Sequence, residues 1–249
     1  ELRNVMKIEL RNIKKEYATP RKTEIKDEIT EIKIDTTDMI AKEDVIVVVT
    51  NDGYIKRVSS RSYSSSDNEP NLKEGDYIIS LANMNTLDTL LLFTDKGNYL
   101  YLPVYLIPDM KWKDMGKHIS NVIKIDENEH IINAYPVYEF NDFNVLTFTK
   151  MGMVKRSILK DYKVSRFNKP ISAIKLKDKD EVVCVSIDNN SEIFISTLNG
   201  NGLWYGVDEV PVSGVKSSGV KAINLKNDEV VSAYTFDKNE EYLTVITDK

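Results

Sequence analysis

Two clusters of three basic residues follow a glycine at the same distances in two separate parts of the sequence. In each cluster a lysine–arginine pair stands three and four residues after the glycine, and a third cation stands eight residues after it. Cations repeated at equivalent positions could neutralise the phosphates of a polyanion. The residues at these equivalent positions are Lys56, Arg57 and Arg61 after Gly53, and Lys155, Arg156 and Lys160 after Gly152.

A longer basic stretch surrounds the second cluster. Residues 150–179 hold ten basic and two acidic residues, a net charge of +8, in a chain whose formal net charge is −5. Such segregation creates a positive face that attracts a polyanion, whereas a solvated strand surface is the alternative interpretation. We predict that Lys163, Arg166 and Lys169 extend the cationic track of the second cluster.

The segment 108–117 forms a third candidate contact. It places Lys111 and Lys113 on either side of Trp112. A tryptophan between cations can stack on nucleic acid, and packing of the ring against a neighbouring part of the protein is at least as common. We therefore include both lysines among the candidate binding residues and keep both interpretations of Trp112.

The glycines belong to a hairpin that recurs along the chain. Each copy has an apolar run, a threonine, two further residues, the glycine and a second strand. β-Branched residues favour strands, and glycine accepts the positive φ of the turn. Steps of 44 to 55 residues between the threonines suit one small antiparallel blade per repeat. The threonine–glycine pairs are Thr50–Gly53, Thr94–Gly97, Thr149–Gly152 and Thr197–Gly200, and a fifth copy begins at Tyr242.

Paired extended segments lie upstream of hairpins three to five and are joined by acidic turns. Four short strands per repeat predict an all-β, propeller-like array of about five four-stranded blades over residues 26–249. The pairs are Ile119–Ile125 with Ile131–Val137, Ile171–Leu176 with Val182–Ile187, and Val220–Leu225 with Val230–Phe236, and Ile29–Ile34 precedes the first hairpin. The expected blades are roughly 26–65, 66–110, 111–165, 166–214 and an incomplete 215–249.

The first 25 residues have a different pattern. An apolar stripe with helical spacing runs through residues 1–17, and Pro20 follows it. Because no N-cap residue precedes this stripe, we expect the end of a longer helix, followed by a linker up to residue 25. The stripe consists of Leu2, Met6, Leu10, Ile13 and Tyr17.

Residues for other kinds of chemistry are scarce. The one cysteine, Cys184, cannot form an internal disulfide, and no apolar run approaches the roughly 18 residues of a membrane span. His118 and His130 lack further ligands at metal-binding spacing, and no GxxxxGK[ST] loop is present. We expect a soluble, intracellular binding domain with no catalytic residue, no metal and no cofactor of its own.

The chain resembles the C-terminal β-pinwheel domain of the A subunits of bacterial type IIA topoisomerases. The resemblance rests on the repeated GYIKR-type hairpin, on ELRNVMKIELRNIKKEY followed by PRKTEI, and on SRSYSSSDNEPNLKEGD after the first hairpin. The second run is similar to the junction with the breakage-reunion core, and the third is similar to topoisomerase IV A subunits of Gram-positive bacteria. The glutamine-arginine-arginine-glycine-glycine-type box of gyrase is absent, so topoisomerase IV is the better match.

The resemblance implies sequence-independent binding and bending of duplex DNA, which presents the transported segment for decatenation and relaxation. It also implies contact with the breakage-reunion core of the same polypeptide, assembly with the B (ATPase) subunit in an A2B2 heterotetramer, and an isolated fragment that is monomeric. ATP and Mg²⁺ would act in the rest of the enzyme. The family's nucleophile is a tyrosine next to an arginine, and no Arg-Tyr dipeptide occurs here. The expected location is the cytoplasm, at the nucleoid, with peripheral membrane association left open.

Two other functions fit the same residues. Hairpins two and four carry Leu100-Tyr101 and Leu203-Trp204 in place of the basic pair, and these could serve a protein-interaction platform, although WD and kelch signatures are absent. The other alternative is the C-terminal domain of a gyrase A subunit that has lost its wrapping box. A propeller hydrolase would need carboxylates around a central channel, whereas Asp and Glu cluster here in turns.

Overall fold

The chain divides into two compact units. They comprise Glu1–Asp38 and Met39–Lys249, and each is described by itself. The computed structural model describes residues 1–23, 39–66, 70–239, 242 and 244. The expected strand Ile29–Ile34 and the expected boundary after residue 25 lie outside these residues.

Helix α1 spans Leu2–Tyr17 in the first unit and confirms the helix predicted from the apolar stripe. None of its side chains is buried, and Lys14 and Lys15 lie in its last turn. Basic residues there interact favourably with the negative end of the helix dipole. Among the described residues, no helix combines the length and the apolar character that crossing a bilayer requires.

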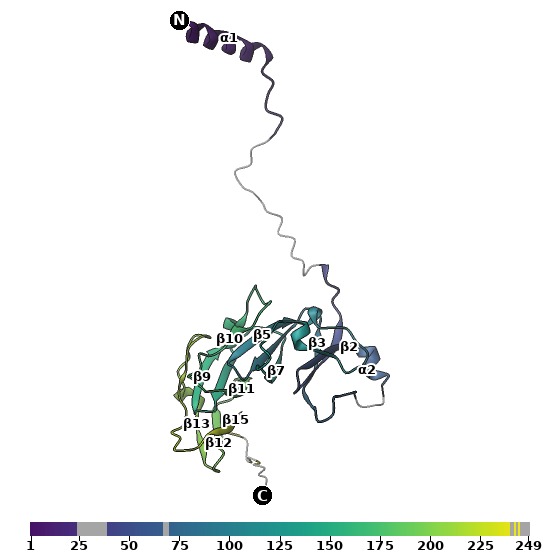
Figure 1. Ribbon diagram of the computed structural model, residues 1–249, viewed down its shortest axis with the longest axis vertical. Coiled ribbons are helices and arrows are strands. Elements are labelled where there is room, and N and C mark those ends of the chain that lie inside the picture. The colour runs from purple at the N-terminus through teal and green to yellow at the C-terminus, as the bar shows by residue number, and fades with distance from the viewer. Residues whose placement is uncertain (24–38, 67–69, 240–241, 243, 245–249) are drawn as a thin grey trace. The chain divides into compact units, whose positions relative to one another are not determined.

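Four β-hairpins organise the second unit (Figure 1). In each hairpin two antiparallel strands pair across the predicted turn, which confirms the four predicted hairpins. The hairpins are β1 (Asp44–Thr50) with β2 (Tyr54–Ser59), β4 (Thr89–Thr94) with β5 (Asn98–Pro103), β8 (Asn144–Thr149) with β9 (Met153–Ile158), and β12 (Glu192–Thr197) with β13 (Gly202–Gly206).

The repeated threonine and glycine explain why every hairpin turns at the same place. The four turn glycines have φ between +77° and +83°, a region that side-chain-bearing residues adopt only at a cost. Each glycine N–H donates to the carbonyl oxygen of the threonine at 2.9–3.1 Å. The threonine hydroxyl accepts the backbone N–H of the fourth residue after it, at 3.1–3.2 Å. These bonds satisfy backbone groups that the turn would otherwise leave without partners.

Each hairpin grows into a sheet by recruiting strands from later in the chain. A third strand follows the hairpin and pairs with its first strand: β3 (Ile78–Asn85), β7 (Ile131–Val137), β11 (Val182–Asp188) or β15 (Val230–Phe236). A two-residue fourth strand comes after the next hairpin and pairs with the second strand: β6 (Lys117–His118), β10 (Ile171–Ser172) or β14 (Val220–Lys221). We name the sheets A (β3-β1-β2-β6), B (β10-β5-β4-β7), C (β11-β8-β9-β14) and D (β13-β12-β15).

A short helix follows the second strand of every hairpin. In sheet A it is α2, and in sheets B, C and D it is a 3₁₀ helix of three or four residues. These helices are α2 (Ser60–Ser64), η2 (Val104–Leu106), η4 (Leu159–Tyr162) and η5 (Val207–Glu209), and a further 3₁₀ helix, η3 (Ile119–Asn121), follows β6.

The exchange of strands corrects the sequential blades that we expected. Ile171–Ser172 is the fourth strand of sheet B and Val182–Asp188 is the third strand of sheet C, although both precede the hairpin of sheet D. The expected strand Ile171–Leu176 pairs over only two residues, because the chain then turns inward and buries Ile174. Likewise, Ile119–Ile125 begins with η3 instead of a strand, and Val220–Leu225 pairs over only two residues.

The number of blades stays a prediction. The described residues form three four-stranded sheets and one three-stranded sheet. The expected fifth hairpin begins at Tyr242, and most of it lies outside the described residues. The prediction of an all-β fold with repeated antiparallel sheets and one N-terminal helix is confirmed.

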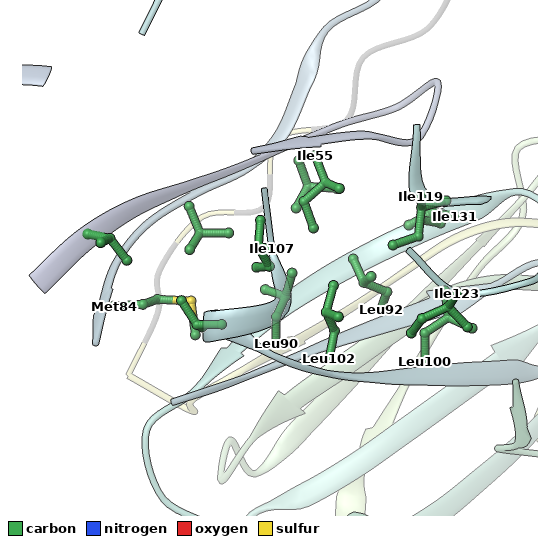
Figure 2. Close-up of a cluster of buried hydrophobic side chains, with 14 residues drawn as sticks. Ile55, Met84, Leu90, Leu92, Leu100, Leu102, Ile107, Ile119, Ile123 and Ile131 are labelled. Atoms are coloured by element: carbon green, nitrogen blue, oxygen red, sulfur yellow. The ribbon is translucent and has the colours of Figure 1, made fainter. Parts of the chain in front are cut away.

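Neighbouring sheets bury apolar side chains against each other. Side chains alternate in direction along a strand, so the two faces of a middle sheet meet the preceding and the following sheet. Both faces of β4 and β8 are buried, which accounts for their continuous apolar runs. Figure 2 shows the cluster between sheets A and B, which includes Ile55, Leu90, Leu92, Leu100 and Ile131. The next clusters join B to C through Leu91, Phe93 and Val145, and C to D through Leu146, Phe148 and Ile193.

Acidic residues before the third strands hold the hairpin tips in place. Each carboxylate accepts a backbone N–H from the tip of its own sheet's hairpin: Asp76 accepts from Asp52 at 2.9 Å, Asp180 from Met151 at 2.9 Å, and Asp228 from Asn199 at 3.1 Å. In sheet B, the buried Glu129 accepts the Thr94 hydroxyl at 2.6 Å. Part of the acidic charge of the chain therefore has a structural use in these turns.

Replacing Gly219 by alanine should destabilise the protein by at least about 2 kcal/mol, because the strand exchange brings backbone close to backbone here. Gly219 has φ of +73°, and an added Cβ would lie 2.3 Å from the carbonyl oxygen of Val154. Urea unfolding measures the loss. Gly214→Ala, in the same loop, is the control because nothing lies within 4 Å of its added Cβ. Equal stability of the two variants would contradict the argument.

Candidate nucleic-acid interface

The structure buries the lysine of both basic pairs. Lys56 on β2 is 1% exposed, and Lys155 on β9 is 0% exposed. The equivalent position in sheet B holds Leu100, which is also fully buried, so this position on the second strand faces the interior. The expectation that both lysines lie on an outer rim is therefore corrected. Neither ammonium group is accessible to a phosphate in this fold.

Lys155 is held by three hydrogen-bond acceptors. Its Nζ donates to the Tyr162 hydroxyl at 3.1 Å, to the Val215 carbonyl oxygen at 2.7 Å, and to the Ala173 carbonyl oxygen. The same atom lies 5.5 Å from the centre of the Tyr162 ring, within the range of a cation–π contact. Burial lowers the pKa of Lys155 to about 7 and also raises the pKa of Tyr162.

Lys56, at the equivalent position of sheet A, contacts a different loop. Its Nζ donates to the carbonyl oxygens of Trp112 at 2.6 Å and Asp114 at 2.5 Å, and lies 5.1 Å from the Trp112 ring centre. Burial lowers the pKa of Lys56, and the Asp114 carboxylate opposes this effect. Trp112 is 6% exposed and meets Tyr63 edge-on with ring centres 4.8 Å apart. Of the two interpretations of Trp112, packing within the protein is the one that the structure supports.

The two arginines of the basic pairs have different surroundings. Arg156 Nε donates to Asn144 Oδ1 at 2.8 Å, and its Nη1 forms an ion pair with Asp208 at 3.2 Å. Arg57 is half-buried, and Val45 takes the place that Asn144 has in sheet C. Its Nε is buried without a hydrogen-bond partner in the described part of the chain. The charge of Arg57 is therefore less compensated than that of Arg156.

The third cation of each cluster is exposed. Arg61 lies on α2 and Lys160 on η4, in the short helix that follows the hairpin. Lys160 pairs with Asp142, and this carboxylate raises the pKa of Lys160. Exposed ion pairs of this kind contribute little to stability, so Lys160 can exchange its partner for another anion.

The apolar hairpins differ in how much surface they offer. Leu100 is 0% and Tyr101 8% exposed, so the second hairpin presents no apolar surface for a partner at these positions. In the fourth hairpin Leu203 is partly buried, whereas Trp204 is 60% exposed and its Nε1 donates to Glu192 at 2.8 Å.

A repeated group of exposed cations lies instead in the loops that carry the chain to a fourth strand. We call residues 108–116, 163–170 and 211–219 the crossover loops; they precede β6, β10 and β14 on sheets A, B and C. Every lysine and arginine in these loops and in the strands that follow them is at least partly exposed. These residues are Lys111, Lys113 and Lys117 for sheet A, Lys163, Arg166 and Lys169 for sheet B, and Lys216 and Lys221 for sheet C.

Sequence reasoning left Lys117, Lys216 and Lys221 outside the candidate set. A signal for two of the loops was present in the sequence. Lys113 and Lys216 each stand three residues before a glycine, Gly116 or Gly219, and both glycines have positive φ where the chain approaches a hairpin strand. The loop of sheet B has Pro170 at this point, which hides the repeat.

Open hollows accompany the crossover loop of sheet A. One, of about 490 Å³, is lined by Ser59, Ser62, Lys111 and Lys117 among others. A second, of about 800 Å³, also includes Lys117, together with Tyr54 and His118. Such concave, partly cationic surfaces can receive an extended anion such as a sugar–phosphate backbone.

No metal centre is evident in the described part of the chain. Among these residues, His, Cys, Asp and Glu do not gather in any group of three or more that could hold a metal ion. His118 Nδ1 lies 2.7 Å from the Ser120 hydroxyl, a local contact that fixes the ring beside the turn. The absence of metal and cofactor from the domain's function remains a prediction.

The pH dependence of stability should reveal the buried Lys155. Between its folded pKa of about 7 and its ordinary value of 10.5, the unfolded state binds more protons than the folded state. As pH rises from about 7 to about 9, the free energy of unfolding should therefore rise relative to that of Lys155→Leu, by up to about 1.4 kcal/mol per pH unit. Urea unfolding at several pH values measures this difference. A constant difference would mean that the pKa of Lys155 is not lowered.

Comparison with known proteins gives consistent matches. The family model described as the DNA gyrase C-terminal domain, beta-propeller, matches residues 44–67, 88–137, 144–186 and 191–237. The chain is 44% identical over 252 residues to the A subunit of DNA topoisomerase 4 from Bacillus subtilis, covering 100% of the chain and 31% of that protein. The corresponding protein of Staphylococcus epidermidis is 42% identical over 239 residues, covering 95% of the chain and 30% of that protein. The chain thus spans about a third of the length of these relatives.

Solved structures agree with these matches. A crystal structure of the C-terminal domain of DNA topoisomerase IV superposes with a TM-score of 0.78 at 47% identity, covering 80% of this chain and 63% of that one. The E. coli ParC C-terminal domain superposes with a TM-score of 0.64 at 17% identity, covering 78% and 80%, and supports the fold alone. The chain therefore belongs to the family of C-terminal β-propeller domains found in gyrase-type A subunits, and within it to the C-terminal domains of topoisomerase IV.

Proposed function

We propose that this domain binds duplex DNA without sequence preference, through the exposed cations of its three crossover loops. The observation that carries the proposal is the position of these cations: they lie in equivalent loops on three successive sheets. Arg61 on α2 adds a further exposed cation next to sheet A, and the poorly compensated charge of Arg57 lies on the adjoining strand β2. Lys56 and Lys155 are not among the proposed contacts, because they are buried.

The chemistry of these residues favours phosphates over bases. Lysine and arginine on loops neutralise phosphates and release counterions, which gives affinity that falls with salt and does not depend on sequence. Reading of bases in the major groove requires an element such as a helix that fits into the groove. The longest helix described in the second unit, α2, has five residues. We therefore expect recognition of the backbone of the duplex.

We propose that the duplex bends as it passes from one crossover loop to the next. Smooth bending of a short duplex costs on the order of 1–6 kcal/mol, and the additional phosphate contacts offset this cost. Each of the three sheets contributes two or three exposed cations, so contact with a second or third loop adds several phosphate contacts at once.

In the complete protein, the bound duplex would be the transported segment, presented to the breakage-reunion core for decatenation and relaxation. The catalytic tyrosine, ATP and Mg²⁺ would act elsewhere in the ATP-dependent enzyme, with the B subunit in an A2B2 heterotetramer. The relatives' names support the topoisomerase assignment alone, and the chain covers about a third of their length. The corresponding location is the cytoplasm, at the nucleoid.

Replacing Lys163, Arg166 and Lys169 together by alanine should weaken DNA binding and flatten its salt dependence. Each phosphate contact contributes roughly 0.9 to the slope of log affinity against log salt, so the slope should fall by up to about three units. Affinity should drop similarly for unrelated DNA sequences, because phosphates carry no base information. Fluorescence anisotropy with labelled duplexes at several salt concentrations measures both quantities.

The matched control for this variant removes three cations from another region. Lys124, Lys177 and Lys226 are exposed and lie near the turns that precede the third strands, away from the crossover loops in sequence. Their replacement by alanine should change the slope by less than about one unit, because they make no phosphate contact in this proposal. Equal flattening by both triple variants would show that only the total charge matters, and would contradict the assignment of the loops.

The isolated chain should neither cleave nor relax supercoiled plasmid, with or without ATP and Mg²⁺. The reason is that the family's Arg-Tyr nucleophile pair and a GxxxxGK[ST] nucleotide loop are both missing from its sequence. Agarose gel electrophoresis of plasmid incubated with the purified chain tests this. A relaxing or cleaving activity that co-purifies with the chain through successive columns would contradict this prediction.

A further inference from the structure

Lys155 contacts one crossover loop and the residues on both sides of another. Tyr162 directly precedes the crossover loop of sheet B, residues 163–170, and Ala173 directly follows its strand β10; both accept from Lys155 Nζ. Val215 lies within the crossover loop of sheet C, residues 211–219, and its carbonyl oxygen accepts from the same atom at 2.7 Å. One side chain on β9 thus joins the crossover loop of sheet C to the residues on both sides of the crossover loop and strand β10 of sheet B.

The three acceptors match the three N–H donors of an ammonium group. The groups that face Lys155 are the Tyr162 hydroxyl from η4, the Ser157 hydroxyl from β9, which lies 2.8 Å from that of Tyr162, and two backbone carbonyls. The Tyr99 hydroxyl of β5 donates to the Tyr162 carbonyl oxygen at 3.3 Å and supports the same corner from sheet B. No carboxylate forms an ion pair with Lys155 among the described residues.

The hairpin of sheet B has no lysine of its own for its crossover loop, and Lys155 of sheet C bonds the residues on both sides of that loop and strand β10. At the position equivalent to Lys56 and Lys155, the hairpin of sheet B carries Leu100, whose side chain cannot form a hydrogen bond to a loop. In sheet A, Lys56 bonds the carbonyls of Trp112 and Asp114 and so holds that sheet's own loop. Lys155 bonds the loop of its own sheet and also Tyr162 and Ala173, which lie before the loop of sheet B and after its strand β10.

We propose that Lys155 is a positioning residue for DNA binding: it fixes the crossover loops of sheets B and C so that their exposed cations are already placed for successive phosphates. This inference rests on the proposed function, because it assigns the loops to the DNA contact. Lys155 itself touches no DNA, since its side chain is fully buried. Order imposed before binding reduces the entropy that association must remove.

The test compares Lys155→Leu with the natural chain. Leucine is chosen because Leu100 occupies the equivalent position in sheet B. We expect affinity for a labelled duplex to fall roughly tenfold, in keeping with the entropic cost of ordering loop side chains on binding. The salt slope should stay unchanged, because every phosphate contact can still form. Hydrogen–deuterium exchange should accelerate in residues 163–170 and 211–219 and remain unchanged in the strands of sheet A.

Two control variants separate the explanations. Lys56→Leu should accelerate exchange only in residues 108–116, since Lys56 bonds only that loop. Lys155→Met, which keeps more of the length of the lysine side chain, replaces Lys155→Leu if the latter does not fold, as judged by circular dichroism. The same loss of affinity and the same local exchange are expected from it.

Several results would overturn the proposal. Unchanged affinity in a folded Lys155 variant would do so, and so would acceleration of exchange throughout all four sheets, because Lys155 would then serve general stability only. A salt slope reduced by about 0.9 with loops unaffected would mean direct phosphate contact. If the triple variant of Lys163, Arg166 and Lys169 binds DNA normally, the proposed interface itself fails. If that variant is weakened and Lys155→Leu is not, only the positioning role fails.

Discussion

The middle sheets of the second unit, B and C, are each packed between two others, and this constraint determines much of what the individual residues can do. The hairpin β4–β5 is apolar on both faces: Leu90 and Leu92 face sheet A, while Leu91 and Phe93 face sheet C. A two-stranded hairpin alone is marginal in water and needs further strands and covering layers. The chain supplies the third strand from the connection to the next hairpin and the fourth from beyond that hairpin. Each four-stranded sheet therefore combines segments of neighbouring repeats by backbone pairing as well as by apolar contact.

The same constraint decides where positive charge can lie. On a strand with both faces covered, alternate residues point to the preceding and the following sheet, and their side chains are buried or only partly exposed. Lys155 accordingly meets carbonyls from the side of sheet B, and Arg156 meets groups that include Asp208 from the side of sheet D. Cations reach solvent where the chain leaves the sheets, in the turns, the short helices and the crossover loops. A buried lysine is compatible with this fold because loop carbonyls on its side need donors.

The hairpins could be predicted because their cause is local. A threonine, a glycine and two residues between them fix the turn, and all of them lie within four positions of the sequence. Sheet membership could not be predicted, because the pairing of Tyr54 with His118 or of Ile171 with Tyr99 joins residues from different repeats. The burial of Lys56 escaped prediction for a related reason. Alternation of residue types shows which side chains share a face, but it does not show whether a later segment covers that face.

Separate uses of acidic and basic residues reconcile an acidic chain with the proposed binding of a polyanion. Carboxylates such as Asp180 and Asp228 accept backbone N–H groups at the hairpin tips, and the exposed cations of the crossover loops lie on other segments of the sequence. Salt screens the exposed cations strongly, so contacts with phosphates weaken steeply as ionic strength rises. Salt screens the buried bonds of Lys155 much less, because water and ions do not reach them. If the proposed interface is correct, the loops should therefore keep their positions at salt concentrations that dissociate DNA, and rebinding would meet an interface whose geometry is already set.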